Sequence, residues 1–250
     1  MLNKSIIALS LLSLLTGCSL DGDDGQDGAQ GVQGTAGNNG ENGTNANSAL
    51  NINLIGRAVL NAQSPEGAAE IVAYQASKKW IYAINSSGDE AVVNIIPADT
   101  FDTAALVKDN EGIVTATNLA SAITLSLNEN TPGDANSIAI DANNQLLAVA
   151  MAATSVGEAG QIAFYNISGD TPVFIKNVTV GALPDMVAFS HDGAKVVVAN
   201  EGEPNGDYSI DPEGTISIID ITNGTIADTA LSINFQDYNN KQAELEAQGL

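Results

Sequence analysis

The sequence contains one cysteine, one histidine and one tryptophan among 250 residues. A single cysteine excludes a disulfide within the chain, and one cysteine with one histidine cannot build a structural zinc site. Only eight residues are lysine or arginine, against 30 that are aspartate or glutamate, and the formal net charge is −22. Because such a chain repels phosphate backbones, nucleic-acid binding is not expected, whereas cations and cationic partners are favoured.

Long apolar runs are also missing, except at the N-terminus. There Lys4 precedes an apolar run at 6–15, which Thr16, Gly17 and Cys18 follow. Small residues directly before a cysteine are typical of a bacterial lipoprotein signal, whose peptidase cleaves before the lipid-bearing cysteine. The alternative is an ordinary secretory signal with an incidental cysteine. We therefore predict a signal peptide at 1–17 and a membrane anchor through a lipid on Cys18.

The residue after the cysteine is Ser19 rather than aspartate. In a Gram-negative host, nothing at this position would direct the lipoprotein to stay in the inner membrane. The expected location is therefore the cell envelope, at the outer membrane or cell surface.

From Gly22 to Gly43, glycine recurs at every third position. This is the period of collagen, in which only glycine fits the axis of the triple helix. The run contains no proline, which favours a flexible polar spacer over a trimer, although trimerisation stays open. We assign residues 18–48 to the lipidated cysteine and this spacer.

The remainder, 49–250, carries a weak internal repeat. The segments 70–85, 137–151 and 186–200 each read as a strand, a polar turn and a second strand, with Ala73, Ala139 and Ala188 at equivalent positions. Further apolar strands are predicted at 91–98, 161–167, 172–180 and 215–221. Strands repeated in this way are the plan of a four-stranded propeller blade, and a β-sandwich without such a period is the alternative.

Three blades do not close a ring, because propellers start at about four. The chain is therefore expected to hold the N-terminal blades, about three, of a larger propeller. The last residues, 239–250, are helix-like and supply no closing strand. The segment 51–60 is a candidate for the strand that completes the last blade.

The stretch 183–221, LPDMVAFSHDGAKVVVANEGEPNGDYSIDPEGTISIIDI, resembles the choice-of-anchor I family of bacterial surface proteins. That family is related to mesenchyme-specific cell-surface glycoproteins, and SHDGAKVVVAN also resembles the repeats of YVTN-type propellers. The resemblance covers about 49–250 and implies a propeller on a varied membrane anchor. Some members are described as phosphatase-like. This chain stops before the family's later blades.

The segment 201–214, which we call the acidic loop, contains five carboxylates and three glycines between two predicted strands. Oxygen-bearing residues at alternate positions before a glycine resemble the first half of a calcium loop. The flanking strands and Pro212 exclude an EF-hand, and a solvated loop is the alternative. The candidate calcium ligands are Glu201, Glu203, Asn205, Asp207, Asp211 and Glu213.

Two further features receive bland interpretations. His191 precedes Asp192-Gly193, a hairpin signal, so we expect an exposed turn residue rather than a catalytic base. Trp80 and Tyr82 alternate on one strand and share a face, where core packing is favoured over a sugar-stacking platform.

The sequence as a whole predicts a lipid-anchored surface module that binds or scaffolds an unknown ligand or protein, with calcium as the candidate cofactor. The alternative is a calcium-dependent phosphoesterase, in which carboxylates hold metal ions that polarise a phosphate. No catalytic residue is assigned.

Overall fold

The computed structural model describes residues 52–60, 64, 67–120 and 122–249. The chain forms two compact units, Met1–Leu50 and Asn51–Leu250, and the description concerns the second. The predicted signal peptide, Cys18 and the glycine-rich spacer lie outside the described residues. The described part is built of strands, with short helices η1 (Ala98–Thr100), η2 (Thr103–Ala105), η3 (Gln236–Tyr238) and α1 (Gln242–Ala247). The predicted all-β class is confirmed.

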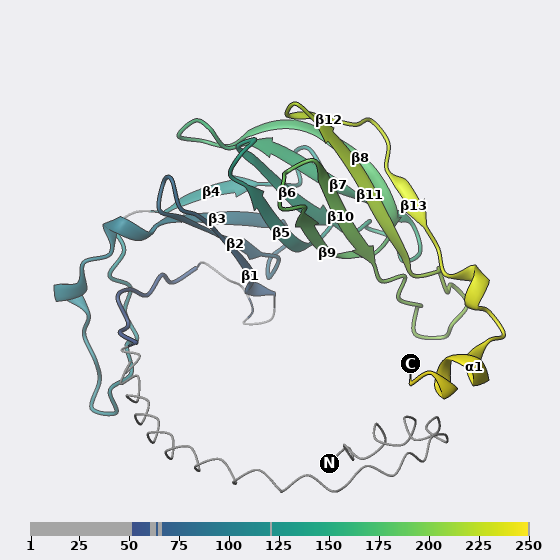
Figure 1. The fold of residues 1–250 in the computed structure, drawn as a ribbon. Helices are drawn as coiled ribbons and strands as arrows, with labels where there is room; N and C mark the ends of the chain where they lie inside the picture. The colour runs from purple at the N-terminus through teal and green to yellow at the C-terminus, as the bar shows by residue number, and fades with distance from the viewer. Residues whose placement is uncertain (1–51, 61–63, 65–66, 121, 250) are drawn as a thin grey trace, which may run out of the picture. The chain divides into compact units, whose positions relative to one another are not determined.

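The strands form three antiparallel sheets that follow one another along the chain (Figure 1). The first contains β1 (Ala68–Gln75), β2 (Trp80–Asn85), β3 (Val92–Pro97) and β4 (Ile123–Ser126). The second contains β5 (Ala135–Asp141), β6 (Leu146–Met151), β7 (Ala159–Asn166) and β8 (Val173–Ala182). The third contains β9 (Pro184–Phe189), β10 (Lys195–Asn200) and β11 (Thr215–Thr222), with β12 (Thr225–Ile226) and β13 (Leu231–Ile233) both paired to β11.

Each sheet is a meander in which strands consecutive in sequence are neighbours in space. This is the plan of a propeller blade, and the fold is a partial propeller of three blades. We call the sheets the first, second and third blade. In the third blade, β12 and β13 together replace a continuous fourth strand, because they pair with opposite ends of β11.

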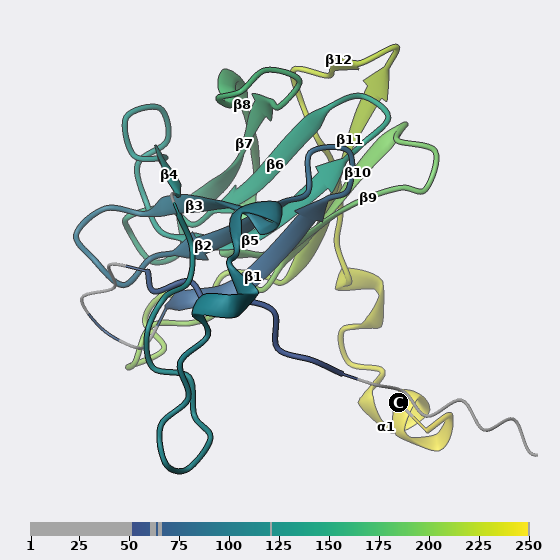
Figure 2. The same cartoon turned by 90° about the vertical axis from the view of Figure 1, so that its left-hand side faces the viewer.

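The predicted hairpins and third strands are all present, as is the helix near the C-terminus. The short strands β4, β12 and β13 were not predicted. Residues 52–60 form no strand in this structure, and their role in closing a last blade stays a prediction. The connection between β3 and β4 leaves the first sheet as a long excursion (Figure 2). No helix among the described residues is long and apolar enough to cross a membrane.

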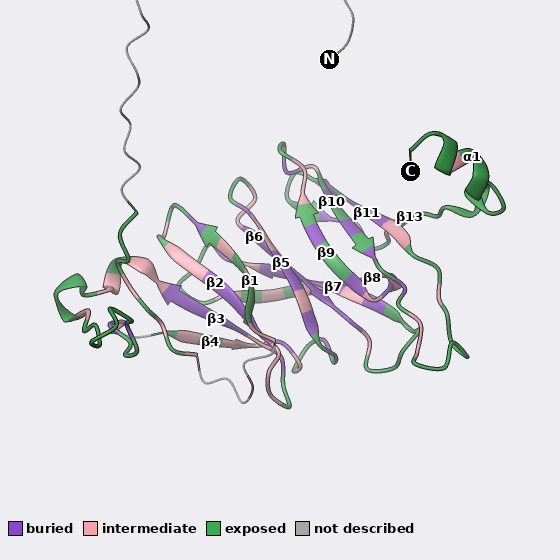
Figure 3. Cartoon of the chain, turned by 90° about the horizontal axis from the view of Figure 1, so that it is seen from below, coloured by how far each residue is buried: buried purple, intermediate pink, exposed green. Residues whose placement is uncertain are grey.

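The blades pack face to face through two apolar clusters. In β6 all six residues are buried, because alternate side chains enter different clusters (Figure 3). Leu147 and Val149 pack toward the first blade, whereas Leu146 and Ala148 pack toward the third. A strand buried on both faces loses the polar alternation of a half-exposed strand, which explains the continuous apolar sequence LLAVAM.

Polar contacts between blades two and three join residues 48–50 positions apart. Asn144 Nδ2 donates to the Gly193 carbonyl at 3.1 Å, and the Val187 amide donates to Ser137 Oγ at 3.2 Å. The separation matches the spacing of 49 between the sequence repeats, so equivalent parts of neighbouring blades touch each other.

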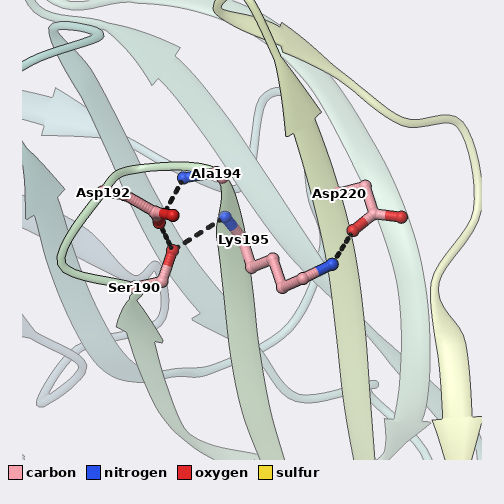
Figure 4. A network of polar contacts seen from close by, with 5 residues as sticks. All are labelled: Ser190, Asp192, Ala194, Lys195 and Asp220. Atoms are coloured by element: carbon pink, nitrogen blue, oxygen red, sulfur yellow. Dashed lines mark hydrogen bonds and ion pairs between the residues drawn. The ribbon is translucent and has the colours of Figure 1, made fainter.

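The hairpin between β9 and β10 confirms the predicted Asp192-Gly193 turn (Figure 4). Gly193 has a φ of +68°, and His191 is exposed, as expected. Asp192 Oδ1 accepts from Ser190 Oγ at 2.6 Å and from the Ala194 amide at 3.1 Å. The hydrogen bond from the Ser190 hydroxyl is the main cause that lowers the pKa of Asp192, because it favours the charged carboxylate.

The aromatic side chains of β2 belong to the core. Tyr82 is fully buried, and Trp80 packs against the same cluster, with its ring centroid 6.4 Å from that of Tyr82. The core interpretation is confirmed, because a buried ring cannot serve as a sugar-stacking platform.

Two buried tyrosines provide a matched test of core polarity. Burial raises the pKa of Tyr82 and of Tyr165 to about 12. The Tyr82 hydroxyl donates to Gln75 Oε1 at 2.8 Å, whereas the Tyr165 hydroxyl has no partner among the described residues. We expect Tyr82→Phe to cost about 1–2 kcal/mol of unfolding free energy and Tyr165→Phe less than about 0.5 kcal/mol. Urea unfolding measures both, and equal losses would contradict this difference.

Candidate functional site

A pocket of about 270 Å³ lies where loops of the second and third blades meet. Its walls come from the segment before and at the start of β5, the β6–β7 loop, the β8–β9 junction and the acidic loop. The lining residues are Asp134, Asn136, Ala152, Ala153, Thr154, Ser155, Val156, Gly157, Glu158, Ala182, Leu183, Glu203, Pro204 and Pro212.

The meander places these segments at one end of the blades. In an antiparallel sheet every second connection lies at the same end, so the link into a blade's first strand shares an end with the loop between its second and third strands. The β4–β5, β6–β7, β8–β9 and β10–β11 connections therefore lie together. The pocket forms because two of these loops come from adjacent blades.

The acidic loop is tied to the β8–β9 junction at its base. The amide of Glu201 donates to the Leu183 carbonyl at 2.8 Å, and the amide of Gly202 donates to the Ala182 carbonyl at 3.2 Å. Leu183 has a φ of +49°, an unfavourable value for a residue with a side chain. Such strain persists only where the surroundings hold it, which here is the pair of hydrogen bonds from the loop.

The ends of the acidic loop approach each other closely. Gly202 has a φ of +65°, and a Cβ at this position would lie 2.7 Å from the backbone of Glu213. Only glycine satisfies both conditions, so the sequence E-G-E at the start of the loop permits this closure.

A hydrogen-bonded turn forms the tip of the loop. Asn205 Oδ1 accepts from the Ile210 amide at 3.0 Å, and Asn205 Nδ2 donates to Ser209 Oγ at 2.8 Å. Asp207 Oδ1 accepts from the Ser209 hydroxyl at 2.6 Å and from its amide at 3.1 Å. The bond from the Ser209 hydroxyl is the main cause that lowers the pKa of Asp207, so this carboxylate stays charged well into the acid range.

The structure separates the predicted calcium ligands. Glu203 reaches the pocket wall, while Glu213 accepts two hydrogen bonds from Gln236 Nε2 at 3.0 and 2.9 Å. Asn205 and Asp207 belong to the tip, and Glu201 and Asp211 are exposed. Among the described residues, no three acidic, histidine or cysteine side chains are grouped so that they could hold a metal ion. Calcium binding by this loop stays a prediction.

Sequence reasoning missed Asp134 and Glu158, which line the pocket together with Glu203. Glu158 lies in the β6–β7 loop, the counterpart of the acidic loop in the preceding blade. The repeat alignment could have found it, because equivalent loops of adjacent blades lie at the same end. The two loops also touch, since a Cβ on Gly157 would lie 2.5 Å from Ile210 Cγ2.

The lining combines carboxylates with apolar surface. Asp134, Glu158 and Glu203 come from three different connections, and Val156, Pro204 and Pro212 provide apolar walls. Outside the pocket, Tyr208 and Ile210 of the acidic loop are exposed at 73% and 45%. Carboxylates on a partly apolar wall attract a positive group that carries hydrocarbon, and no basic residue is among the described residues that line the pocket.

Comparison with known proteins gives one family and one structural likeness. The choice-of-anchor I domain matches residues 70–250. No curated protein matches the chain. Among solved structures, Kuenenia stuttgartiensis hydrazine synthase is similar with a TM-score of 0.43 and 16% identity. The match covers 70% of this chain and 38% of that one.

The blade assignment rests on the order of the strands, and the family match covers most of the part that forms the blades. Family and topology agree with the resemblance of residues 183–221. The chain belongs to the choice-of-anchor I family and is a cell-surface module of the β-propeller type.

Proposed function

We propose that this surface propeller is a binding module whose pocket between the second and third blades receives a cationic group of its partner. The observation that carries the proposal is the convergence of Asp134, Glu158 and Glu203, from three separate connections, on one pocket of about 270 Å³. The overall formal charge of −22 supports the same choice, because it raises the local concentration of cations around the protein.

Calcium is the second candidate for this end of the blades. The acidic loop carries five carboxylates within 14 residues, and their mutual repulsion is relieved by a bound cation. Calcium takes six to eight oxygen ligands, which carboxylates, carbonyls and water together provide. The ligands would come from Glu201, Glu203, Asn205, Asp207, Asp211 and Glu213 after some rearrangement of the loop.

A calcium-dependent phosphoesterase is the enzymatic alternative. It would need a cationic side chain near the metal ions to hold the phosphate. The lining of the pocket offers none among the described residues. The binding module is therefore the function that we propose, and the enzyme stays an untested alternative.

The proposal includes an anchor and a spacer. A lipid on Cys18 would hold the mature chain in the membrane, and the glycine-rich segment to residue 48 would separate the blades from the lipid surface. If the host is Gram-negative, we place the anchor in the outer membrane.

Calorimetric titration of the purified protein with calcium chloride, and separately with tetralysine, tests the proposal. A pocket variant, Asp134→Asn with Glu158→Gln and Glu203→Gln, removes three charges while keeping side-chain size. A matched loop variant, Glu201→Gln with Asp207→Asn and Asp211→Asn, removes three charges outside the pocket. We expect the pocket variant to weaken tetralysine binding at least tenfold more than the loop variant.

The two variants separate a specific pocket from general acidity. Equal weakening of tetralysine binding would show a diffuse charge effect and contradict the pocket. Calcium heat that disappears in the loop variant would support calcium binding by the acidic loop. Absence of saturable heat with either titrant, in folded protein, would contradict both candidates.

A further inference from the structure

The third blade has one buried face and one exposed face. Val187, Val196 and Val198 pack against the second blade and are almost fully buried. The intervening residues of the same strands point the other way, and Met186 and Val197 are 53% and 40% exposed. We call the exposed side the outer face. Its apolar residues are Met186, Ala188, Val197, Ala199, Ile216, Ile218, Leu231 and Ile233.

The outer face is apolar across all its strands. Val197 is paired with Ala188 on one side and Ile218 on the other, and Ile218 is paired with Leu231 of β13. One such row therefore crosses four strands without a polar side chain. The apolar area ends at the ion pair of Lys195 and Asp220, which is partly exposed (Figure 4).

Equivalent faces of the other two blades are covered. In the second blade, Ala139, Ala148 and Phe164 occupy the row that Ala188, Val197 and Ile218 occupy in the third. That row packs against the third blade. In the first blade, the corresponding row of Ala73, Tyr82 and Ile95 packs against the second blade.

The three repeat alanines summarise the comparison. Ala73 and Ala139 are partly buried against a following blade, whereas Ala188, at the same position, is exposed. A small residue on an inner strand permits close approach of the next sheet, and on a solvated face it would have no such use. Exposed apolar faces of this kind mark interaction surfaces.

We infer that the outer face of the third blade docks a further four-stranded blade of the same build, carried by the same polypeptide. The face continues an interface that the molecule already forms twice. Both of those interfaces join blades that follow each other in the sequence, as consecutive elements usually do. The docked sheet presents β-branched residues in the manner of Val187, Val196, Val198 and Ile219.

A second copy of the chain is the less favourable occupant. Two chains that each carry a formal charge of −22 repel each other, whereas sheets linked in one polypeptide are held at high effective concentration. This surface is separate from the cation pocket, so the inference does not depend on the proposed function.

Single-cysteine labelling tests the docking. The protein is isolated as its host produces it, with Val197→Cys in one variant and Thr225→Cys, at an exposed site of β12, in the other. The unaltered protein gives the background of Cys18. We expect a maleimide to react with Cys at 197 at least tenfold more slowly than at 225 in the native monomer, and equally fast in urea.

Other outcomes would overturn the inference. Equal reaction rates at the two positions in native protein would mean that the outer face is open. Protection at 197 that is present in a dimer fraction, and lost in the monomer after size-exclusion chromatography, would replace the fourth blade by a second copy.

Discussion

Replacing Gly133 by alanine is expected to lower the free energy of unfolding by roughly 3–5 kcal/mol, a large share of the stability of a domain. Gly133 has a φ of +126°, and a Cβ at this position would lie 1.8 Å from the carbonyl oxygen of Ala152. Both the backbone conformation and the space exclude a side chain. The adjacent hydrogen bond from the Ala152 amide to the Asp134 carbonyl, at 2.8 Å, would be displaced with it.

Gly206→Ala is the matched control, because Gly206 has open space around its Cβ position. Its expected cost is below about 1 kcal/mol. Urea unfolding followed by circular dichroism measures both variants. If Gly133→Ala were as stable as Gly206→Ala, the close approach of the β4–β5 and β6–β7 connections would be wrong. The cation pocket between those connections would then lose its wall.

Replacing Cys18 by serine is expected to move the protein from the membrane fraction to the soluble fraction almost completely. A serine hydroxyl does not carry the lipid, and without it the chain has no membrane anchor among those that we propose. Cell fractionation followed by labelling with a radioactive fatty acid measures the change. The expected result is loss of both the label and the membrane association.

Ser19→Ala is the matched control for the anchor, because it alters the neighbouring residue without removing the thiol. It should keep the label and stay in the membrane fraction. Membrane association of Cys18→Ser at the level of this control would contradict the lipid anchor and favour an ordinary secretory signal.

Hairpins were predictable because each combines two apolar strands with a polar turn over about 15 residues. Asp192-Gly193 required a turn, and LLAVAM required a strand with no solvated face. The outer strands were harder. β4 has four residues, and β12 and β13 have two and three, which is too short for periodicity to show.

The candidate site was predictable only in part. The acidic loop was visible in the sequence as a cluster of carboxylates, and the structure places Glu203 in a pocket. The sequence could not show that Asp207 would be held by Ser209, because that contact depends on the turn at the loop tip. Asp134 and Glu158 join the pocket through the packing of two blades, a long-range effect that local patterns do not contain.

Amide chemical shifts of the ¹⁵N-labelled protein during titration with tetralysine test the central claim most directly. A cationic group in the pocket should shift the amides of Asp134, Glu158 and Glu203 together, at one common binding constant. Shifts confined to the loop tip, or spread evenly over the acidic surface, would contradict the pocket as the binding site of this surface module.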